Sequence, residues 1–201
     1  MSFDHLLVFN LALLAAIMSP GPALLIAVQT TLSAGRRAGM AVGAGLGLMA
    51  ATWTAAALLG LEVVFAAAPW AVVLVKTAGA VYLIYVAFMM WRGARAPIAA
   101  TPQPAHKAFR TGLMINVLNP KSFLFSAAVL VVIFPADMSL LARSAVVVNH
   151  LAIELTFYVL LALAMSIPTV RAAYLGAKFY IDRCAAVVLG AVGLRLLFSR
   201  P

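Results

Sequence analysis

A small set of ionisable side chains lies inside segments that are otherwise apolar, and these side chains could bind a charged solute or carry a proton. Lys121 and Glu154 each lie near the middle of such a segment, where a charged group is costly and usually functional. His150 and Tyr158 flank Glu154 at a spacing of four residues, so all three share one face of a helix. This face is expected to point into the interior of a helix bundle.

The carboxyl group of Glu154 has two interpretations. As a functional group, it binds the ammonium group of a substrate or takes up a coupling proton. As a structural group, it forms a buried ion pair with Lys121 that only orders the bundle. We favour the functional interpretation. Lys76 and Arg195 lie near the ends of their segments, so their charged heads can extend to the membrane surface.

Two apolar segments, residues 6–31 and 111–134, are each interrupted by proline near the middle. Proline removes a backbone donor and clashes with the preceding turn, which predicts a broken or kinked helix in each segment. A matched pair of broken helices is a sequence indication of a transporter's binding site near the middle of the membrane. The alternative is that the two kinks only shape the helices.

The two breaks and Glu154 together predict a site for a zwitterion. Backbone amides at the start of a helix carry partial positive charge and suit a carboxylate, and Lys121 adds a full charge. Glu154 would bind the ammonium group and also couple transport to protons. The predicted substrate-binding residues are Ser19, Pro20, Gly21, Pro22, Asn116, Asn119, Pro120, Lys121 and Glu154.

The composition places these segments in a membrane. Of the 201 residues, 66% are hydrophobic and only 9% are charged, and the mean hydropathy is +1.11. These values predict an all-α polytopic membrane protein with a single membrane domain over residues 1–201. Spans of about 20 residues can be placed six times. They lie near residues 6–31, 39–61, 69–91, 111–134, 144–167 and 184–198.

The net charge of +9 does not indicate a nucleic-acid partner, because the basic residues gather on one side of the predicted spans. An excess of Lys and Arg marks the cytoplasmic side of a membrane protein. The pattern therefore predicts both termini outside the cytoplasm. The basic residues of the predicted cytoplasmic loops are Arg36, Arg37, Arg92, Arg95, Lys107, Arg110, Arg171, Lys178 and Arg183.

A proline-rich loop, residues 93–108, divides the chain into half-repeats of about 1–92 and 109–201. Each half holds three predicted spans, so the halves must have opposite orientations. This is the inverted-repeat architecture of many secondary transporters, with helices 1 and 4 broken.

Small residues recur every fourth position in the second segment, at Gly39, Gly43 and Gly47. Such a stripe lets helices approach closely, and we favour packing inside one molecule over the alternative of a homodimer face. The first segment is interpreted as a retained span, because no basic residue precedes it and no cleavage site follows. The single cysteine, Cys184, excludes an internal disulfide.

At these positions the chain resembles the LysE/RhtB family of amino-acid exporters. Glu154, Pro168 and the Tyr180-Ile181-Asp182-Arg183 stretch are most similar to the threonine/homoserine exporter branch of that family. The other matching elements are Ser19-Pro20-Gly21-Pro22, Gly39/Gly43/Gly47, Gly79-Ala80-Val81-Tyr82-Leu83, Phe109-x-x-Gly112-x-x-x-Asn116-x-x-Asn119-Pro120-Lys121 and Gly190-x-x-Gly193.

The resemblance implies a bacterial inner-membrane protein that exports a small amino acid or a close derivative, driven by the proton motive force. It implies no cofactor and no enzymatic activity. One departure concerns Ala23, which stands where many relatives have a polar or acidic residue. This departure argues against a preference for basic amino acids.

Other functions fit the residues less well. A metal-ion exporter would need clustered His, Cys or carboxylate ligands, whereas His5, His106 and His150 are far apart in sequence. An intramembrane enzyme would need a catalytic motif, and neither H-E-x-x-H nor G-x-S-x-G is present. A different small-metabolite exporter and a non-transporting membrane subunit remain as alternatives.

Overall fold

The computed structural model describes residues 3–18, 21–60, 77, 80–81, 84–85, 87–96, 104–135 and 138–198. The described residues form α-helices and no β-strand, which agrees with the all-α prediction. The helices are α1 (Phe3–Met18), α2 (Pro22–Ala34), α3 (Arg36–Leu58), α6 (Ala105–Val117), α7 (Pro120–Ile133), α8 (Leu140–Ala164) and α9 (Pro168–Phe198).

The first apolar segment is two helices rather than one, because α1 ends at Met18 and α2 begins at Pro22 with a bend of 60°. Pro22 occupies the first turn of α2, where its missing N–H costs no hydrogen bond. Gly21 is the N-cap residue and has an extended backbone. Ser19 and Pro20 lie outside the described residues.

The second break separates α6 from α7. Pro120 begins α7, and the backbone carbonyl of Asn119 accepts the first helical hydrogen bond from the amide of Phe123 at 3.3 Å. The α6 helix begins at Ala105, earlier than the predicted start at residue 111. Both proline-containing segments are therefore divided into two helices at the predicted places.

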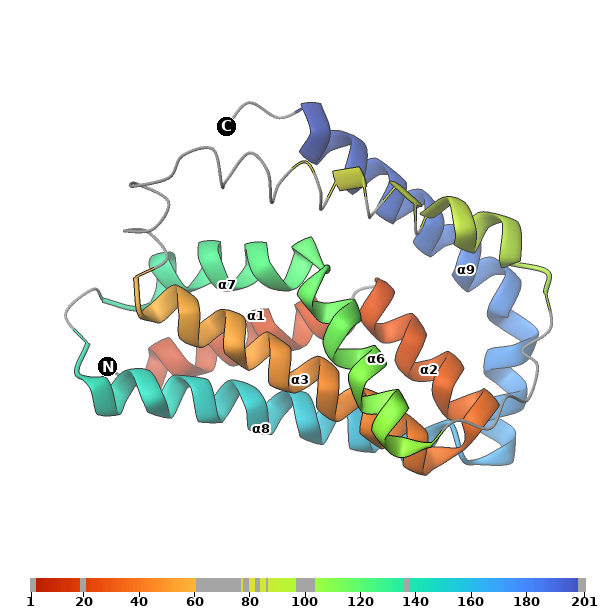
Figure 1. Ribbon diagram of the computed structural model, residues 1–201, viewed down its shortest axis with the longest axis horizontal. Coiled ribbons are helices and arrows are strands. Elements are labelled where there is room, and N and C mark those ends of the chain that lie inside the picture. The colour runs from red at the N-terminus through yellow and green to blue at the C-terminus, as the bar shows by residue number, and fades with distance from the viewer. Residues whose placement is uncertain are drawn as a thin grey trace.

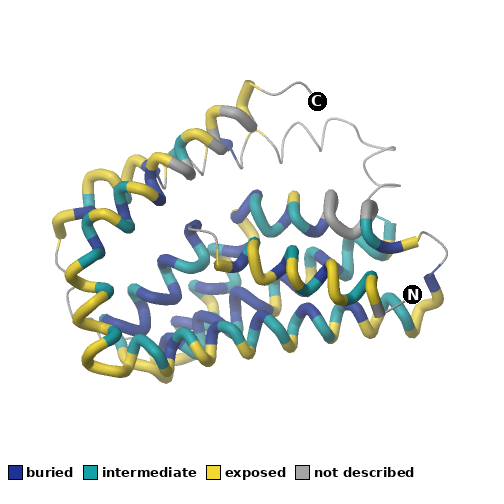
Figure 2. Tube along the Cα trace, turned by 180° about the vertical axis from the view of Figure 1, so that it is seen from behind, coloured by how far each residue is buried: buried dark blue, intermediate teal, exposed yellow. Residues whose placement is uncertain are grey.

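Helix α3 lies at the centre of the molecule and contacts α2, α6, α7 and α8 (Figure 1). Its glycines make these contacts close. A side chain on Gly43 would collide with Cβ of Tyr158, and one on Gly47 would lie 2.8 Å from Cβ of Glu154. The stripe therefore packs inside the molecule, against the helix that carries the predicted acidic residue. The buried residues concentrate along these helices (Figure 2).

Helix α9 differs from the prediction. It runs without interruption from Pro168 to Phe198, whereas the sequence predicted a span over 184–198 preceded by a loop. An ion pair between Lys178 and Asp182, at 2.7 Å and one helical turn apart, lies within the stretch that was predicted as a loop. This pair stabilises the helical conformation there. Residues 87–96 lie beside α9 (Figure 1).

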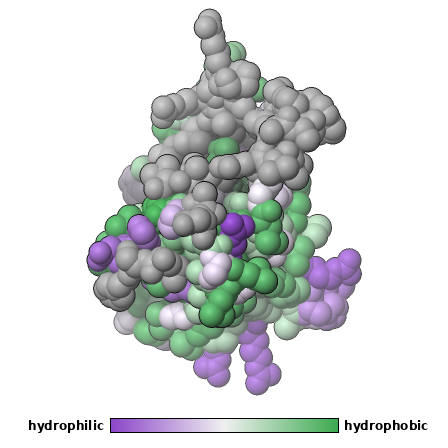
Figure 3. Space-filling model, turned by 90° about the vertical axis from the view of Figure 1, so that its left-hand side faces the viewer, coloured by the Kyte–Doolittle hydropathy of each residue, from purple (hydrophilic) through white to green (hydrophobic). Residues whose placement is uncertain are grey.

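Among the described residues, α3 and α8 are long and apolar enough to cross a membrane, and the bent pair α1–α2 would make a third span. Most of the predicted third span lies outside the described residues. Apolar side chains dominate the face that Figure 3 leaves uncovered by grey atoms, and hydrophilic ones gather at its margins. Exposed leucines and valines on α1 and α8, such as Leu11 and Val148, fit contact with lipid.

Candidate functional site

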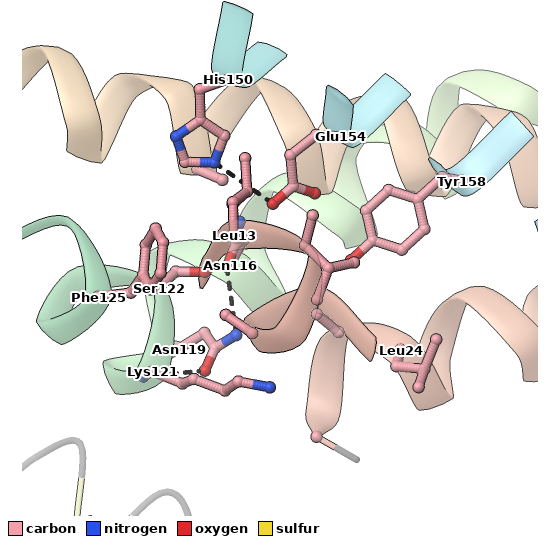
Figure 4. A pocket seen from close by; sticks show the side chains of 15 residues that line it. Leu13, Leu24, Asn116, Asn119, Lys121, Ser122, Phe125, His150, Glu154 and Tyr158 are labelled. Carbon is pink, nitrogen blue, oxygen red and sulfur yellow. Dashed lines mark hydrogen bonds and ion pairs between the residues drawn. The ribbon is translucent and has the colours of Figure 1, made fainter. Parts of the chain in front are cut away.

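A cavity of about 40 Å³ lies between the two helix breaks and α8 (Figure 4). We call it the central cavity. One of its walls carries the ionisable groups of α8, and the opposite wall carries the residues of the α6–α7 break. Its lining residues are Leu13, Ala16, Ile17, Gly21, Ala23, Leu24, Ala50, Asn116, Asn119, Lys121, Ser122, Phe125, His150, Glu154 and Tyr158.

The α8 wall presents His150, Glu154 and Tyr158 in a row, and all three are buried. Nε2 of His150 lies 3.5 Å from Oε1 of Glu154. Gly43 and Gly47 on α3 hold the backbone of α8 close, at the turns that carry Tyr158 and Glu154. The predicted stripe of His, Glu and Tyr therefore faces the interior of the bundle.

Two polar atoms of this wall are buried without a hydrogen-bond partner: Nε2 of His150 and Oε2 of Glu154. A buried polar group without a partner costs about 1–3 kcal/mol. Because both residues line the central cavity, a bound molecule would supply the missing partners, and Oε2 of Glu154 would accept from a hydrogen-bond donor. An ammonium group has three such donors.

The Nδ1 atom of His150 contacts residues that do not line the cavity. This atom lies 2.7 Å from Oγ1 of Thr54, which in turn lies 3.2 Å from Oγ of Ser126. Thr54, on α3, and Ser126, on α7, are both fully buried. Phe9 and Phe125 pack edge-on against the imidazole, with ring centroids 5.7 and 6.3 Å away.

The α6–α7 break is held by its two asparagines. Nδ2 of Asn116 donates to the carbonyl of Leu46 on α3, and Nδ2 of Asn119 donates to Oδ1 of Asn116 at 3.3 Å. Oδ1 of Asn119 accepts from the backbone amide of Lys121 at 3.2 Å, as an N-cap residue does. These contacts fix the first turn of α7 and hence the origin of the Lys121 side chain.

Positive charge reaches the central cavity from two elements. Lys121 lines it from α7 and lies within electrostatic range of Glu154. The first turn of α2 lines it through Gly21, Ala23 and Leu24, and among the described residues no side chain caps that end of the helix. The helix start contributes partial positive charge there.

The rest of the wall is apolar and built from small or aliphatic residues. Leu13, Ala16 and Ile17 of α1 and Ala50 of α3 form this part, together with Ala23 and Leu24. No side chain there could pair with a second charge on a ligand. The cavity therefore combines two charged ends with an apolar wall.

The structure brings together five of the predicted substrate-binding residues. Gly21, Asn116, Asn119, Lys121 and Glu154 all line the central cavity. Pro22 and Pro120 are buried at the first positions of α2 and α7, and they are not among the lining residues. Ser19 and Pro20 cannot be placed, since they lie outside the described residues.

The sequence-based list omitted several residues that line the cavity. His150 and Tyr158 had a signal, because they share the face of Glu154. Ser122 had a weaker one, since it follows Lys121 within the first turn of α7. Leu13 and Phe125 had none, because apolar residues are common throughout these helices and only tertiary packing selects the ones at the cavity.

Comparison with known proteins finds similarity over most of the chain. The profile of the family described as LysE type translocator matches residues 14–200. The threonine efflux protein of Escherichia coli K12 is 27% identical over 194 residues, which cover 93% of this chain and 94% of that protein.

Two further relatives overlap this match. The uncharacterized membrane protein YahN of Escherichia coli K12 is 30% identical over 90% of this chain and 83% of its own length. The homoserine/homoserine lactone efflux protein of Salmonella typhimurium is 30% identical over 64% of each chain. No solved structure matches the chain.

Proposed function

Because the chain belongs to the LysE type translocator family, we propose that it exports a small neutral amino acid, similar to threonine or homoserine, across the bacterial inner membrane by proton antiport. The family and the relatives named as efflux proteins support amino-acid export. The central cavity supports the class of substrate, and it is the observation on which the proposal rests.

A free amino acid carries a carboxylate and an ammonium group on one carbon atom. Lys121 and the uncapped start of α2 suit the carboxylate, and Glu154 suits the ammonium group from the opposite wall. The remaining apolar wall leaves a substrate side chain without a charged partner. This arrangement favours a neutral side chain over a basic or acidic one.

Coupling between substrate and proton follows because Glu154 has two alternative partners. Its carboxylate either binds the substrate ammonium group or takes up a proton, and the two events exclude each other. A carrier that changes orientation only with one of them bound exchanges substrate for a proton. In this scheme Asn116 and Asn119 hold the α6–α7 break through contacts with the protein, and Lys121 contacts the substrate.

The two divided segments would form the matched broken helices of an inverted repeat. With six spans and the observed charge pattern, both termini lie outside the cytoplasm. The central cavity of about 40 Å³ has room for a few water molecules, each of which needs roughly 10–15 Å³ on this measure. Binding an amino acid therefore requires the two breaks to move apart.

Efflux from cells that are preloaded with labelled amino acids tests the proposal. We expect energised efflux of threonine or homoserine, abolished by an uncoupler, by Glu154→Gln and by Lys121→Ala. Lys107→Ala is the matched control, because Lys107 is an exposed lysine on α6 away from the cavity. Efflux that survives both cavity substitutions would reduce the two charges to a structural role. No efflux of any amino acid would overturn the function.

The alternatives have less support. Within the part of the chain that the structure describes, no three His, Cys, Asp or Glu side chains form a group that could hold a metal ion. A homodimer remains a proposal, and the glycine stripe is not its interface, since Gly43 and Gly47 are buried against α8.

A further inference from the structure

We propose that Ser126, Thr54 and His150 form a proton pathway that delivers the coupling proton to Glu154 from the side of the molecule opposite to the substrate's entry. This inference rests on the proposed antiport function and adds a route and three residues to it. In this pathway His150 transfers the proton to Glu154, and Thr54 and Ser126 supply protons to His150. None of the three belongs to the predicted substrate site.

The contacts form one continuous chain through three helices. Ser126 on α7 contacts Thr54 on α3 at 3.2 Å, and Thr54 contacts Nδ1 of His150 on α8 at 2.7 Å. Nε2 of His150 faces Oε1 of Glu154 at 3.5 Å. Each member can both donate and accept a proton, as an imidazole and a hydroxyl group do. The chain ends at the carboxyl group that the antiport scheme protonates.

The last contact explains why an imidazole occupies this position. His150 is 1% exposed, and its Nε2 has no hydrogen-bond partner. The Nδ1–Thr54 contact fixes the ring so that Nε2 points toward Glu154 and the cavity. A histidine that served only packing would not be expected to hold one nitrogen in a short hydrogen bond and aim the other at a buried carboxyl group.

Apolar rings pack against the imidazole of His150. Phe9 and Phe125 cover the imidazole, and Phe134 packs on Phe9 with ring centroids 5.5 Å apart. Phe9 is completely buried. Because these rings are apolar, the hydroxyl groups of Thr54 and Ser126 provide the polar connection beside them.

The direction follows from the predicted orientation of the helices. Thr54 lies in the last turns of α3, and His150 lies on the N-terminal side of Glu154 in α8. Both helix ends face outward if the basic loops are cytoplasmic. The pathway thus leads to the face from which the proton motive force drives protons inward. Substrate would enter from the opposite side.

Each transfer conserves protons. The Nε2–H bond of His150 breaks and an O–H bond forms on Glu154. In the same concerted step the Thr54 hydroxyl gives its proton to Nδ1 and the Ser126 hydroxyl gives one to Thr54, so that no imidazolate forms. A water molecule or hydronium ion that reaches Ser126 when the carrier opens to the outer face restores its proton. One proton enters and one resides on Glu154. Rotation of the hydroxyl groups and reorientation of the imidazole ring, which turns its N–H back toward Glu154, reset the chain.

Other ionisable groups near His150 are Glu154 and Tyr158 on α8 and Lys121 on α7. The described residues of α1 and α6 that line the cavity are not ionisable. A pH effect on the pathway therefore has to be separated from effects on these three groups. Substituting the two hydroxyl residues achieves this, because neither lines the central cavity.

The test uses the purified full chain in vesicles of phosphatidylethanolamine and phosphatidylglycerol, with labelled threonine and homoserine as probes. Two rates are measured: exchange of substrate for substrate at equal pH, and net transport driven by a pH gradient. Exchange needs no proton, so it reports folding and binding. Trapped pyranine reports the proton movement that accompanies net transport.

We expect Thr54→Val to keep exchange and to lower gradient-driven transport by about a hundredfold, the size of a typical proton-transfer contribution. Ser126→Ala should act in the same way, and Thr54→Ser should restore driven transport. Thr52→Val is the matched control, since Thr52 lies on the same helix but is exposed and bonds only its own helix, at Leu48. It should leave both rates unchanged.

Driven transport by Thr54→Val at the wild-type rate would overturn the pathway and leave the exporter intact. Loss of both rates in Thr54→Val would overturn it as well, because Thr54 would then act in packing or binding. A wild-type protein that neither exchanges nor accumulates either probe would overturn the proposed function and the pathway together.

Discussion

Asn119 shows how one residue of the central cavity can fix the position of another. Its backbone carbonyl accepts the first helical hydrogen bond of α7, and its side chain caps the amide of Lys121. Its own amide group donates to Asn116, which is tied to α3. The direction of the Lys121 side chain thus depends on two neutral neighbours.

We expect Asn119→Ala to lower the free energy of unfolding by about 1 kcal/mol, the usual cost of losing an N-cap side chain. Asn119→Asp should lose less, since a carboxylate keeps the acceptor for the Lys121 amide. Thermal unfolding of the detergent-solubilised protein measures both variants. Equal stability of Asn119→Ala and the wild type would show that the side chain does not cap α7.

At this scale the sequence predicted several of the residues that lie at the cavity, and their roles stay predictions. Lys121 and Glu154 were identified because charges in a membrane are rare and costly. Asn116 and Asn119 were predicted to bind substrate, and that stays a prediction. Both line the central cavity, and they also make hydrogen bonds within the protein that the sequence did not predict. Sequence alone cannot distinguish these roles, since the partner of Asn116 is a backbone carbonyl 70 residues away.

At the scale of elements, the contact between α3 and α6 depends on glycine. A side chain on Gly45 would collide with the backbone of α6 at Phe109, and one on Gly112 would collide with the backbone of α3 at Val42. The two helices therefore meet backbone to backbone. Small residues allow such an approach, and backbone atoms cannot move aside as a flexible side chain can.

Gly112→Ala should therefore destabilise the protein by about 1–3 kcal/mol, the cost of overpacking, although alanine favours helix more than glycine does. Gly176→Ala is the matched control, because no atom lies near its added methyl group and α9 is helical there. It should be neutral or stabilising by up to about 1 kcal/mol. A Gly112→Ala protein as stable as the control in thermal unfolding would contradict close packing.

The helix breaks were predictable because proline acts locally, through its own ring and missing donor. Gly43 and Gly47 were also expected to pack inside the molecule. The start of α6 and the length of α9 were not predicted. The Lys178–Asp182 pair that stabilises helix in α9 is local, but Lys178 also donates to the carbonyl of Gly93, which is distant in sequence.

On the scale of the whole molecule, α9 is joined to residues 87–96 by a polar and aromatic cluster. Lys178 donates to the carbonyls of Gly93 and Ala94 at 3.3 and 3.2 Å and pairs with Asp182. The guanidinium of Arg183 lies 3.7 Å from the ring centroid of Trp91. These contacts link the end of the first half of the chain to the last helix of the second half.

Tyr174 lies near this cluster, in the part of α9 that precedes the predicted sixth span. Burial, and then the negative charge of Asp182, raises the pKa of Tyr174 to about 12. The phenol therefore stays neutral at physiological pH. Asp182 forms its ion pair with Lys178, at 2.7 Å, beside this neutral phenol.

Asp182→Ala should destabilise the protein by about 3 kcal/mol or more, because it leaves the buried Lys178 without its counter-ion. The double variant Lys178→Met/Asp182→Leu should lose less than the single variant, since no charge is then left buried. Chemical or thermal unfolding of the three proteins measures the difference. A double variant less stable than the single one would show that the bonds to Gly93 and Ala94 outweigh the charge.

The division of the central cavity into charged ends and an apolar wall bears on how such exporters diverge in evolution. The groups that would hold the carboxylate and the ammonium group recognise what all amino acids share. Ala16, Ala23 and Ala50 on the apolar wall would contact what differs between them. A lineage could thus acquire a new substrate through one or two changes in these alanines, while Lys121 and Glu154 stay the same. Sequence identity across the chain would then be a poor guide to which amino acid each relative exports.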